Sequence, residues 1–341
     1  MTVNQQWLIA RQPRGPLRPS DFTWRESPLE PLGPGMVRTR VLYAWLDPTN
    51  RVWFSRGSYL PPLVVGDVMR AVCIGVVEES NNPALQPGTT VTGFMGWQTR
   101  STSDGSDLTV LPELPGLPLT AHFGLLSHIG LAAYHGVVDI GRPQPGQTVV
   151  VSAAAGAVGS LAGQIAKIAG ARVIGIAGGP EKCRRITEDL GFDAAIDYKG
   201  EDVVAALRRL CPDGVDVYFD NVGGAVLDAV LGEINDFGRV VACGMIGEYD
   251  ESGQGHVFTN LSNLVNRRTT LQGFIVLDHL DLVEVAYPRL LDWHAAGRLQ
   301  YAVDVVDGLE NVPAALGRLF EGTNSGKLIA RISTDEGADA R

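Results

Sequence analysis

Cysteine is scarce in this sequence of 341 residues. The four cysteines lie far apart and no two form a Cys-x-x-Cys pair: they are Cys73, Cys183, Cys211 and Cys243. Such scattered thiols are not the pattern of a disulfide framework, nor do they supply the cluster of about four ligands that a structural zinc site needs. They are typical of reduced thiols, so a cytoplasmic location is expected.

Three other features are also missing. The formal net charge is −10, which argues against a protein that binds nucleic acid through its phosphate backbone. No uninterrupted apolar run reaches the about 20 residues that span a membrane, and residues 1–14 lack the apolar segment of a secretory signal. No metal site is expected, because the six histidines lack ligand spacing: His122, His128, His135, His256, His279 and His294.

What the sequence does contain is typical of a globular chain, with 45% hydrophobic residues, and its length suits two domains. The first third is rich in strand-like runs separated by Pro and Gly. The clearest are Val37–Leu46, Arg70–Glu79 and Thr89–Phe94. We therefore expect a small β domain of barrel-like or irregular form here.

From about residue 120 the pattern changes to alternating strands and helices, which predicts parallel βαβ units and a doubly wound sheet. We expect this domain at 123–304, and the β domain at 1–122 and 305–341, where a late strand Lys327–Ile332 returns to it. The predicted strands are Thr148–Ser152, Arg172–Ala177, Ala194–Asp197, Val215–Phe219, Arg239–Cys243 and Thr270–Val276. The predicted helices run to about Gly170, over Pro180–Leu190 and Glu201–Leu210, and to about Asn235.

A glycine-bearing turn follows the first of these strands. Gly156, Ala157, Val158 and Gly159 keep the spacing of the last two glycines of a dinucleotide fingerprint, and Ala153 stands at the first. Small residues let backbone N–H groups approach a pyrophosphate, which then faces a helix N-terminus. The position between a clear strand and a clear helix favours a dinucleotide site over the alternative, a tight turn in a domain that binds no nucleotide.

The end of the second strand distinguishes NAD from NADP. An NAD site usually places an acid there to hold the ribose 2′-hydroxyl, but Ala177 is followed by Gly178 and Gly179. Lys182, Arg184 and Arg185 come next, and such cations suit a 2′-phosphate. We predict NADPH as the cofactor; the alternative is that these charges form only a solvated helix turn.

With these residues in view, the chain resembles the zinc-free medium-chain dehydrogenase/reductase superfamily, particularly its 2-alkenal and prostaglandin reductases. The matching stretches include residues 58–62 (SYLPP), 145–159 (PGQTVVVSAAAGAVG) and, most specifically, 218–224 (YFDNVGG). The resemblance covers about residues 5–332 and implies a fold of class α/β, with a Rossmann doubly wound parallel sheet plus a GroES-like β-barrel domain.

The resemblance also implies roles for individual residues. Gly178 and Lys182 would contact the 2′-phosphate, Tyr198 the adenosine end, and Asn221 the ribose side of the cofactor. The remaining implied cofactor contacts are Cys243, Gly244, Met245, Ile246 and Tyr249 beside the nicotinamide ribose, the strand end Phe274, Ile275 and Val276, and the late Asn324.

This chain departs from the family pattern at two places, and at a third it differs from zinc-containing relatives. Thr49 stands where the family often has tyrosine, and residues 127–134 (SHIGLAAY) replace its GMPGLTAY. Residues 65–68 (VGDV) lack the His-Glu of zinc-containing relatives. Without a metal, hydrogen bonds must polarise a substrate carbonyl, which favours conjugate reduction over alcohol oxidation.

We therefore predict that the chain uses NADPH to reduce the carbon–carbon double bond of an α,β-unsaturated aldehyde or ketone. Tyr249 is our first candidate for the proton donor, and Tyr59 the second; water or a purely cofactor-binding role for Tyr249 stays open. The predicted substrate residues are Asn50, Arg51, Trp53, Tyr59 and His128, although core packing is the favoured alternative for Trp53.

Two other functions fit the same sequence. One is a quinone reductase of the same superfamily, and the other is a nonenzymatic, NADPH-binding protein that senses redox state. The partner in either enzymatic case is a small molecule. We also predict a homodimer, in which the edge strand Thr270–Val276 pairs with its copy across a two-fold axis.

Overall fold

The computed structural model describes residues 3–13, 15, 17–54, 59–249 and 255–334, so Ser58 of the SYLPP stretch lies outside the described residues. The chain forms two compact units. Unit 1 falls within Met1–Leu119, Asp304–Asn324 and Leu328–Arg341, and unit 2 within Thr120–Val303 and Ser325–Lys327. The predicted boundaries lay at 122/123 and 304/305; the units divide at 119/120 and 303/304, and three late residues join unit 2.

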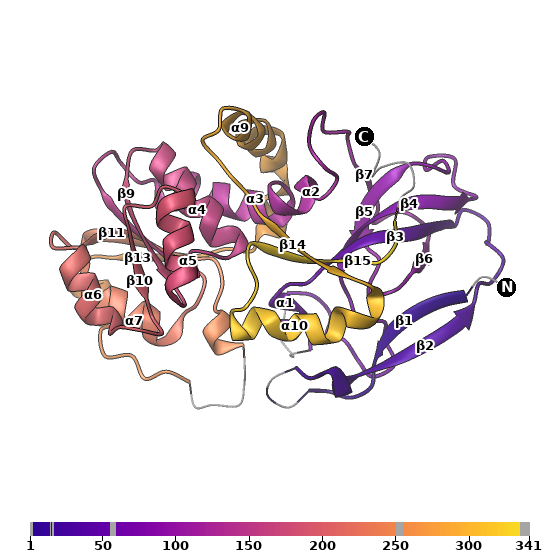
Figure 1. The fold of residues 1–341 in the computed structure, drawn as a ribbon, viewed down its shortest axis with the longest axis horizontal. Helices are drawn as coiled ribbons and strands as arrows, with labels where there is room; N and C mark the ends of the chain where they lie inside the picture. Colours follow the sequence, from indigo (N-terminus) through magenta and orange to yellow (C-terminus); the bar gives the residue numbers. More distant parts are fainter. Residues whose placement is uncertain (1–2, 14, 16, 55–58, 250–254, 335–341) are drawn as a thin grey trace. The chain divides into compact units, whose positions relative to one another are not determined.

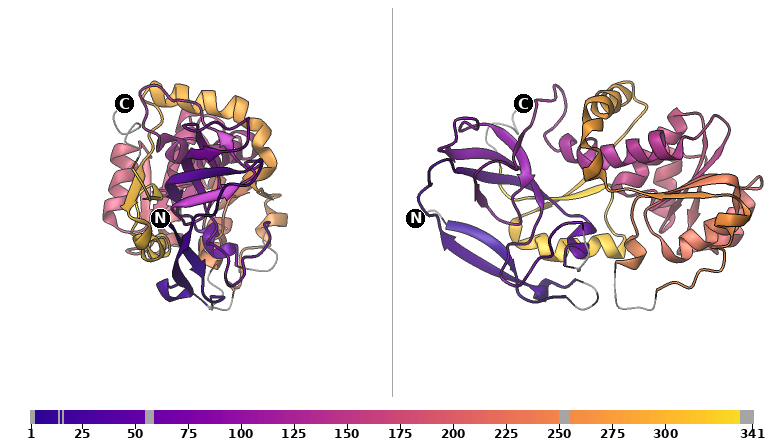
Figure 2. Two further views of the ribbon diagram at one scale, coloured as in Figure 1. Left: turned by 90° about the vertical axis from the view of Figure 1, so that its right-hand side faces the viewer. Right: turned by 180° about the vertical axis from the view of Figure 1, so that it is seen from behind.

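Unit 1 is built on a seven-stranded, mainly antiparallel sheet and a separate hairpin, β1–β2 (Figures 1 and 2). The sheet order is β14-β15-β3-β4-β5-β7, with β6 also paired to β3. Its strands are β1 (Val3–Ile9), β2 (Phe22–Pro28), β3 (Val37–Trp45), β4 (Val72–Ser80), β5 (Thr90–Phe94), β6 (Arg100–Ser103), β7 (Thr109–Val110), β14 (Val303–Asp307) and β15 (Lys327–Arg331). Its helices and single turns (η) are η1 (Pro19–Asp21), α1 (Thr49–Val52), η6 (Leu309–Asn311) and α10 (Val312–Glu321).

Unit 2 contains a parallel sheet (Figure 1). Its strands lie in the order β10-β9-β8-β11-β12-β13. Its strands are β8 (Thr148–Ser152), β9 (Arg172–Ala177), β10 (Ala194–Asp197), β11 (Val215–Asp220), β12 (Ile234–Ala242) and β13 (Thr270–Gly273). Its helices and turns are α2 (Ala121–Gly124), α3 (Ser127–Tyr134), η2 (His135–Gly141), α4 (Ala157–Ile168), α5 (Pro180–Arg184), η3 (Arg185–Asp189), α6 (Val203–Leu210), α7 (Gly224–Gly232), η4 (Ile246–Glu248), α8 (Asn263–Asn266), η5 (Val276–Leu282) and α9 (Val283–Ala295).

The strand order of this sheet reverses between β8 and β11. Strands are added outward from β8 through β9 to β10, and then on the other side from β11 through β12 to β13. All five residues of β8 are buried, as expected for a parallel strand covered on both faces. In a doubly wound sheet, ligands bind beyond the carboxyl ends of the strands at such a switch point. The candidate site of unit 2 therefore lies past the ends of β8 and β11.

The helical segment Ala121–Gly141, which comprises α2, α3 and η2, has 21 residues and is long and apolar enough by length and composition alone to cross a membrane. Within unit 2, however, 78% of its most apolar window is buried, and it packs against α4 and α9. Histidine, serine and aspartate interrupt it, which is why the sequence shows no uninterrupted apolar run. Its burial is that of a core helix.

The last strand of the sheet is shorter than predicted. We expected a strand over Thr270–Val276, but β13 ends at Gly273, and Val276 begins the turn η5. Placing Phe274, Ile275 and Val276 on the strand was therefore wrong. The reason is the neighbouring strand: β12 ends at Ala242, the partner of Gly273, so no ladder remains for the next residues to join.

Candidate cofactor site and active-site residues

The turn after β8 has the geometry of a phosphate cradle. Ala153 takes a left-handed conformation (φ 46°), and the Gly156 N–H bonds its carbonyl at 2.9 Å. Gly156 caps the twelve-residue helix α4. A Cβ on Gly159 would lie 2.4 Å from the Ala153 oxygen, so only glycine allows this close packing. Gly156, Ala157 and Val158 stay half-buried at the positive end of the helix, where an anion is favoured.

A late segment of the chain reaches this turn. Gly326 forms a parallel bridge with Gly156, and the Lys327 N–H bonds the Ala302 carbonyl at 2.9 Å. Asn324, a predicted phosphate contact, is buried and directly precedes the three residues that belong to unit 2. The structure therefore brings the residues that follow Asn324 to the fingerprint.

The turn after β9 is shaped by two glycines. A Cβ on Gly178 would lie 2.8 Å from the Tyr198 ring, so the predicted adenosine residue covers the predicted 2′-phosphate glycine. Gly179 has a φ of 89°, which favours glycine. Its N–H donates to Asp197 Oδ1 at 2.7 Å, and this bond lowers the pKa of Asp197. The acid of this region thus stands at the end of β10, where it fixes the glycine turn.

The three cations of this region have different surroundings. Arg184 pairs with Glu188 at 3.2 Å, and Arg185 donates to the Ser325 hydroxyl. Lys182 is half-buried on the five-residue helix α5. The prediction for the 2′-phosphate rests on Lys182 together with the glycine turn.

Backbone hydrogen bonds hold the loop after β12 to the turn after β11. The Cys243 and Gly244 N–H groups both donate to the Asp220 carbonyl, at 2.9 and 3.1 Å. The Ile246 N–H donates to the Asn221 carbonyl at 3.1 Å. Tyr249, predicted as the proton donor, folds back on this loop, and its hydroxyl accepts the N–H of Met245 at 3.1 Å.

Asn221 is itself anchored to the end of β8. Its backbone N–H donates to Ser152 Oγ at 2.9 Å, and its side-chain Nδ2 donates to the Ser152 carbonyl at 2.7 Å. The structure therefore joins Asn221, the glycine turn and the loop bearing Tyr249 at one edge of the sheet. The contribution of Asp220 and Ser152 was missed from the sequence, because neither residue belongs to the glycine pattern.

Phe274 lies in a cluster of aromatic rings that sequence reasoning also missed. Its ring meets the His135 ring edge-on, with centroids 5.1 Å apart, and the rings of His135 and His279 lie 3.9 Å apart. His135 is buried and its Nδ1 lies 2.9 Å from Asp139. Ile275 remains 37% exposed.

Two predicted substrate residues, Asn50 and Arg51, are buried in unit 1. The Asn50 side chain accepts the Asp47 N–H at 2.8 Å and donates to the Arg70 carbonyl at 3.0 Å. Arg51 Nε donates to the Gly15 carbonyl at 3.2 Å. These contacts give both side chains a structural role, and their contact with substrate stays a prediction.

Trp53 and Tyr59 adjoin in the same unit. Trp53 is only 1% exposed, as the core-packing alternative expects, whereas Tyr59 is 42% exposed. Burial raises the pKa of the Tyr59 hydroxyl, and the neighbouring Trp53 and Thr49 side chains act in the opposite direction. Tyr59 thus keeps its proton at neutral pH, beside the position where the family pattern has tyrosine and this chain has Thr49.

His128 lies in unit 2 near the start of α3, and its Nδ1 is 3.5 Å from Ser127 Oγ. Ser127 adopts a left-handed conformation (φ 52°) at the position where the family pattern has glycine. Ser127 thus takes a conformation that favours glycine, directly before His128. Its role toward substrate stays a prediction.

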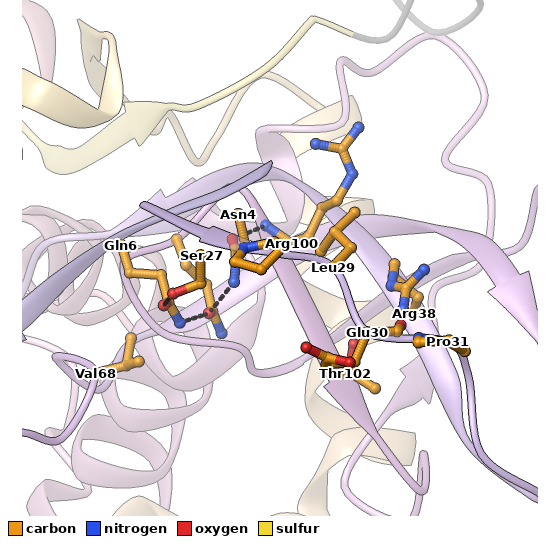
Figure 3. A pocket seen from close by; sticks show the side chains of 12 residues that line it. Asn4, Gln6, Ser27, Leu29, Glu30, Pro31, Arg38, Val68, Arg100 and Thr102 are labelled. Atoms are coloured by element: carbon orange, nitrogen blue, oxygen red, sulfur yellow. Dashed lines mark hydrogen bonds between the residues drawn. The ribbon is translucent and has the colours of Figure 1, made fainter. Parts of the chain in front are cut away.

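A hollow of about 430 Å³ in unit 1 lies between the hairpin β1–β2 and the sheet (Figure 3). Its polar groups bond one another: Asn4 and Gln6 both donate to Gln98 Oε1, at 2.9 and 2.7 Å. Arg100 is paired with Glu78 at 2.7 Å. The predicted site residues do not line it, and we assign its polar network to holding the hairpin on the sheet.

Among the described residues, no three His, Cys, Asp or Glu side chains are grouped so that they could hold a metal ion.

Two family descriptions match the chain, "N-terminal domain of oxidoreductase" over residues 5–111 and "Zinc-binding dehydrogenase" over residues 157–295.

Several individual proteins are similar over nearly the full length. The chain is 38% identical to an NADPH-dependent curcumin reductase of Escherichia coli K12 over 98% of both chains. It is 38% identical to prostaglandin reductase 1 of Sus scrofa, covering 97% of this chain and all of that one. The structure of CurA from Vibrio vulnificus in complex with NADPH superposes with a TM-score of 0.92 at 36% identity, covering 97% and 100% of the two chains. These matches confirm the predicted Rossmann and GroES-like architecture.

Proposed function

We propose that this chain reduces the carbon–carbon double bond of α,β-unsaturated aldehydes and ketones. The premise is its family: the chain belongs to the medium-chain dehydrogenase/reductase superfamily, in the branch of the curcumin, 2-alkenal and prostaglandin reductases. Within that branch it is an NADPH-dependent oxidoreductase. The observation that carries the proposal is the assembly of the glycine turn, Asn221 and the loop bearing Tyr249 at the switch point of the parallel sheet.

The residues at this edge fit NADPH. The positions where a Cβ would fill the cradle are glycines, Gly159 at the pyrophosphate turn and Gly178 under the Tyr198 ring. Gly156 and the N-terminus of α4 would hold the pyrophosphate, and Lys182 would hold the 2′-phosphate. When bound, the cofactor supplies a hydride, which in this proposal reaches the β-carbon of the substrate.

The chain's own groups have two tasks in this reaction. Negative charge develops on the carbonyl oxygen, and hydrogen-bond donors directed at that oxygen lower the barrier. The α-carbon then needs a proton, for which we propose Tyr249, with Tyr59 as the second candidate. The Tyr249 oxygen accepts the Met245 N–H, and this bond orients the phenol on the loop.

A substrate panel tests the proposal. Purified protein is given NADPH with enals, enones and quinones, oxidation of the cofactor is followed by absorbance, and products are identified by NMR. We expect saturated aldehydes and ketones from the enals and enones, with the carbonyl retained. Turnover of quinones alone would replace the proposal with a quinone reductase. Tight NADPH binding without any turnover would indicate a nonenzymatic binding protein.

We also propose that the protein is a cytoplasmic homodimer that pairs through β13. This strand ends the sheet, and all four of its residues are exposed. Leu271 on this strand is 41% exposed, and Phe237 and Val265 elsewhere in unit 2 are exposed at 69% and 78%. Light scattering at low micromolar concentration should give twice the 36.4 kDa chain mass, and Leu271→Lys should shift it toward the monomer. A wild-type protein that scatters only as a monomer would contradict the dimer, and cell fractionation tests the location.

A further inference from the structure

The carboxylate of Asp220 is a hub at the switch point of the sheet. Asp220 ends β11 and is 1% exposed. Its Oδ1 accepts the Tyr218 hydroxyl at 2.7 Å and the Ser152 hydroxyl at 3.1 Å. The same oxygen accepts the N–H groups of Val222 and Gly223, at 2.9 and 3.0 Å. Four donors therefore converge on one buried carboxylate oxygen.

Among the described residues, no Lys, Arg or His side chain forms an ion pair with this carboxylate. Its charge is compensated by the four hydrogen bonds and by the N-terminus of the nine-residue helix α7, which begins just after Gly223. Because a buried carboxylate is costly without such partners, the tight turn 220–223 and the charge stabilise each other.

The carbonyl groups of this turn hold the next loop. Asp220, Asn221 and Val222 offer their carbonyl oxygens to the N–H groups of loop 243–247 over 2.9 to 3.1 Å. On its other side the turn is bonded to Ser152, the last residue before the glycine turn. The turn 220–223 therefore sets the loop that bears Tyr249 relative to the glycine turn.

The adenosine end of the site uses a different network. Gly179 is held by Asp197 from β10, and Tyr198 covers Gly178. The hydrogen bonds recorded for Asp220 reach none of these residues. The two halves of the cofactor site are thus fixed by separate parts of the sheet.

We propose that Asp220 is a positioning residue that fixes the nicotinamide half of the cofactor site and leaves the 2′-phosphate half independent. This inference rests on the cofactor assignment within the proposed function, and it does not depend on which double bond is reduced. Binding experiments without substrate therefore test it separately from the activity.

The experiment compares two ligands by calorimetry: NADPH, and adenosine 2′,5′-bisphosphate, which carries only the adenosine half. In Asp220→Ala we expect the dissociation constant for NADPH to rise about 10- to 100-fold, since bonds to a charged group are lost. The constant for the bisphosphate should change less than about twofold. Asp220→Asn keeps an acceptor oxygen and should recover about half of the logarithmic loss.

Asp216 offers a matched control at the opposite end of β11. It also joins this strand to β8, accepting the Thr148 N–H at 2.8 Å, and it accepts the Asn235 side chain at 2.9 Å. Asp216→Ala should lower the melting temperature and leave both dissociation constants unchanged. This separates positioning from a general loss of stability.

Two results would overturn the inference. One is an equal loss of affinity for NADPH and for the bisphosphate, which would mean that Asp220 only supports the fold. The other is unchanged NADPH binding in a folded Asp220→Ala variant. If that variant does not fold, Asp220→Asn carries the same comparison, and an equal effect on both ligands again rejects the idea. Failure of wild-type protein to bind NADPH would instead reject the cofactor assignment.

Discussion

Replacing Lys182 by alanine tests how the chain distinguishes NADPH from NADH. Lys182 lies on α5, just beyond the Gly178–Gly179 turn that Asp197 holds. A hydrogen bond to a charged group contributes about 1.5–3 kcal/mol, and about 1.4 kcal/mol corresponds to a tenfold change in affinity. Because Lys182 is half-buried and partly screened by solvent, we expect the lower part of this range.

The dissociation constant for NADPH should therefore rise about 10- to 30-fold in Lys182→Ala, while that for NADH changes less than about twofold. Fluorescence titration of both cofactors at fixed ionic strength measures this, since charge interactions are screened over about 8 Å at 0.15 M salt. Lys182→Arg keeps the charge and should recover most of the affinity.

Arg184→Ala is the matched control on the same helix. Its guanidinium pairs with Glu188 at 3.2 Å, and both side chains are more than half exposed. Its loss should leave both cofactor affinities within about twofold, because exposed pairs of this kind contribute little. The reasoning fails if the wild-type protein binds NADH as tightly as NADPH, or if Arg184→Ala reproduces the Lys182→Ala defect.

Three further predictions concern other parts of the chain. If Tyr249 donates the proton, Tyr249→Phe should lower turnover about 10²-fold. If Tyr249 only holds the cofactor, the same change should raise the Michaelis constant for NADPH and leave turnover nearly unchanged. A variant with wild-type turnover and a wild-type Michaelis constant would exclude both roles. Turnover should survive exhaustive chelation, and loss that zinc restores would contradict the expectation of no metal. Burial acts to raise the pKa of Asp228, but hydrogen bonds from Asn260 and Thr259 lower it to about 2. This carboxylate therefore stabilises the fold above about pH 4 and loses its effect as pH falls toward 2, so denaturant unfolding should show the difference between wild type and Asp228→Asn shrinking over that window.

The doubly wound sheet could be predicted from the sequence because its signals are local. The strand Thr148–Ser152 is an unbroken apolar run, which predicts a parallel strand covered on both faces of the sheet, and all five of its residues are buried. Gly156 and Gly159 follow it at fixed spacing. Each of these features can be recognised without knowing which strand lies beside which.

Other features depend on distant partners and could not be predicted in this way. The strand β1 carries polar residues such as Gln5 and Gln6, and it is defined by its pairing with β2, residues 22–28. The end of β13 is set by the end of β12, a different strand. The hub at Asp220 needs Ser152 and Tyr218 to converge from two strands, and no spacing along the chain reveals that.

The 2′-phosphate end shows how such a distant contact changes the physical reasoning. The sequence favours NADPH because no acid ends β9, yet Asp197 from the next strand reaches the same turn and takes the Gly179 N–H. It also accepts the Lys199 N–H at 3.0 Å, and these bonds keep it ionised at neutral pH by lowering its pKa. The Gly179 N–H is then committed to Asp197 and cannot donate to a phosphate. The Gly179 N–H therefore cannot take over the role of the Lys182 ammonium, and the loss of NADPH affinity in Lys182→Ala should not be offset at that position of the turn.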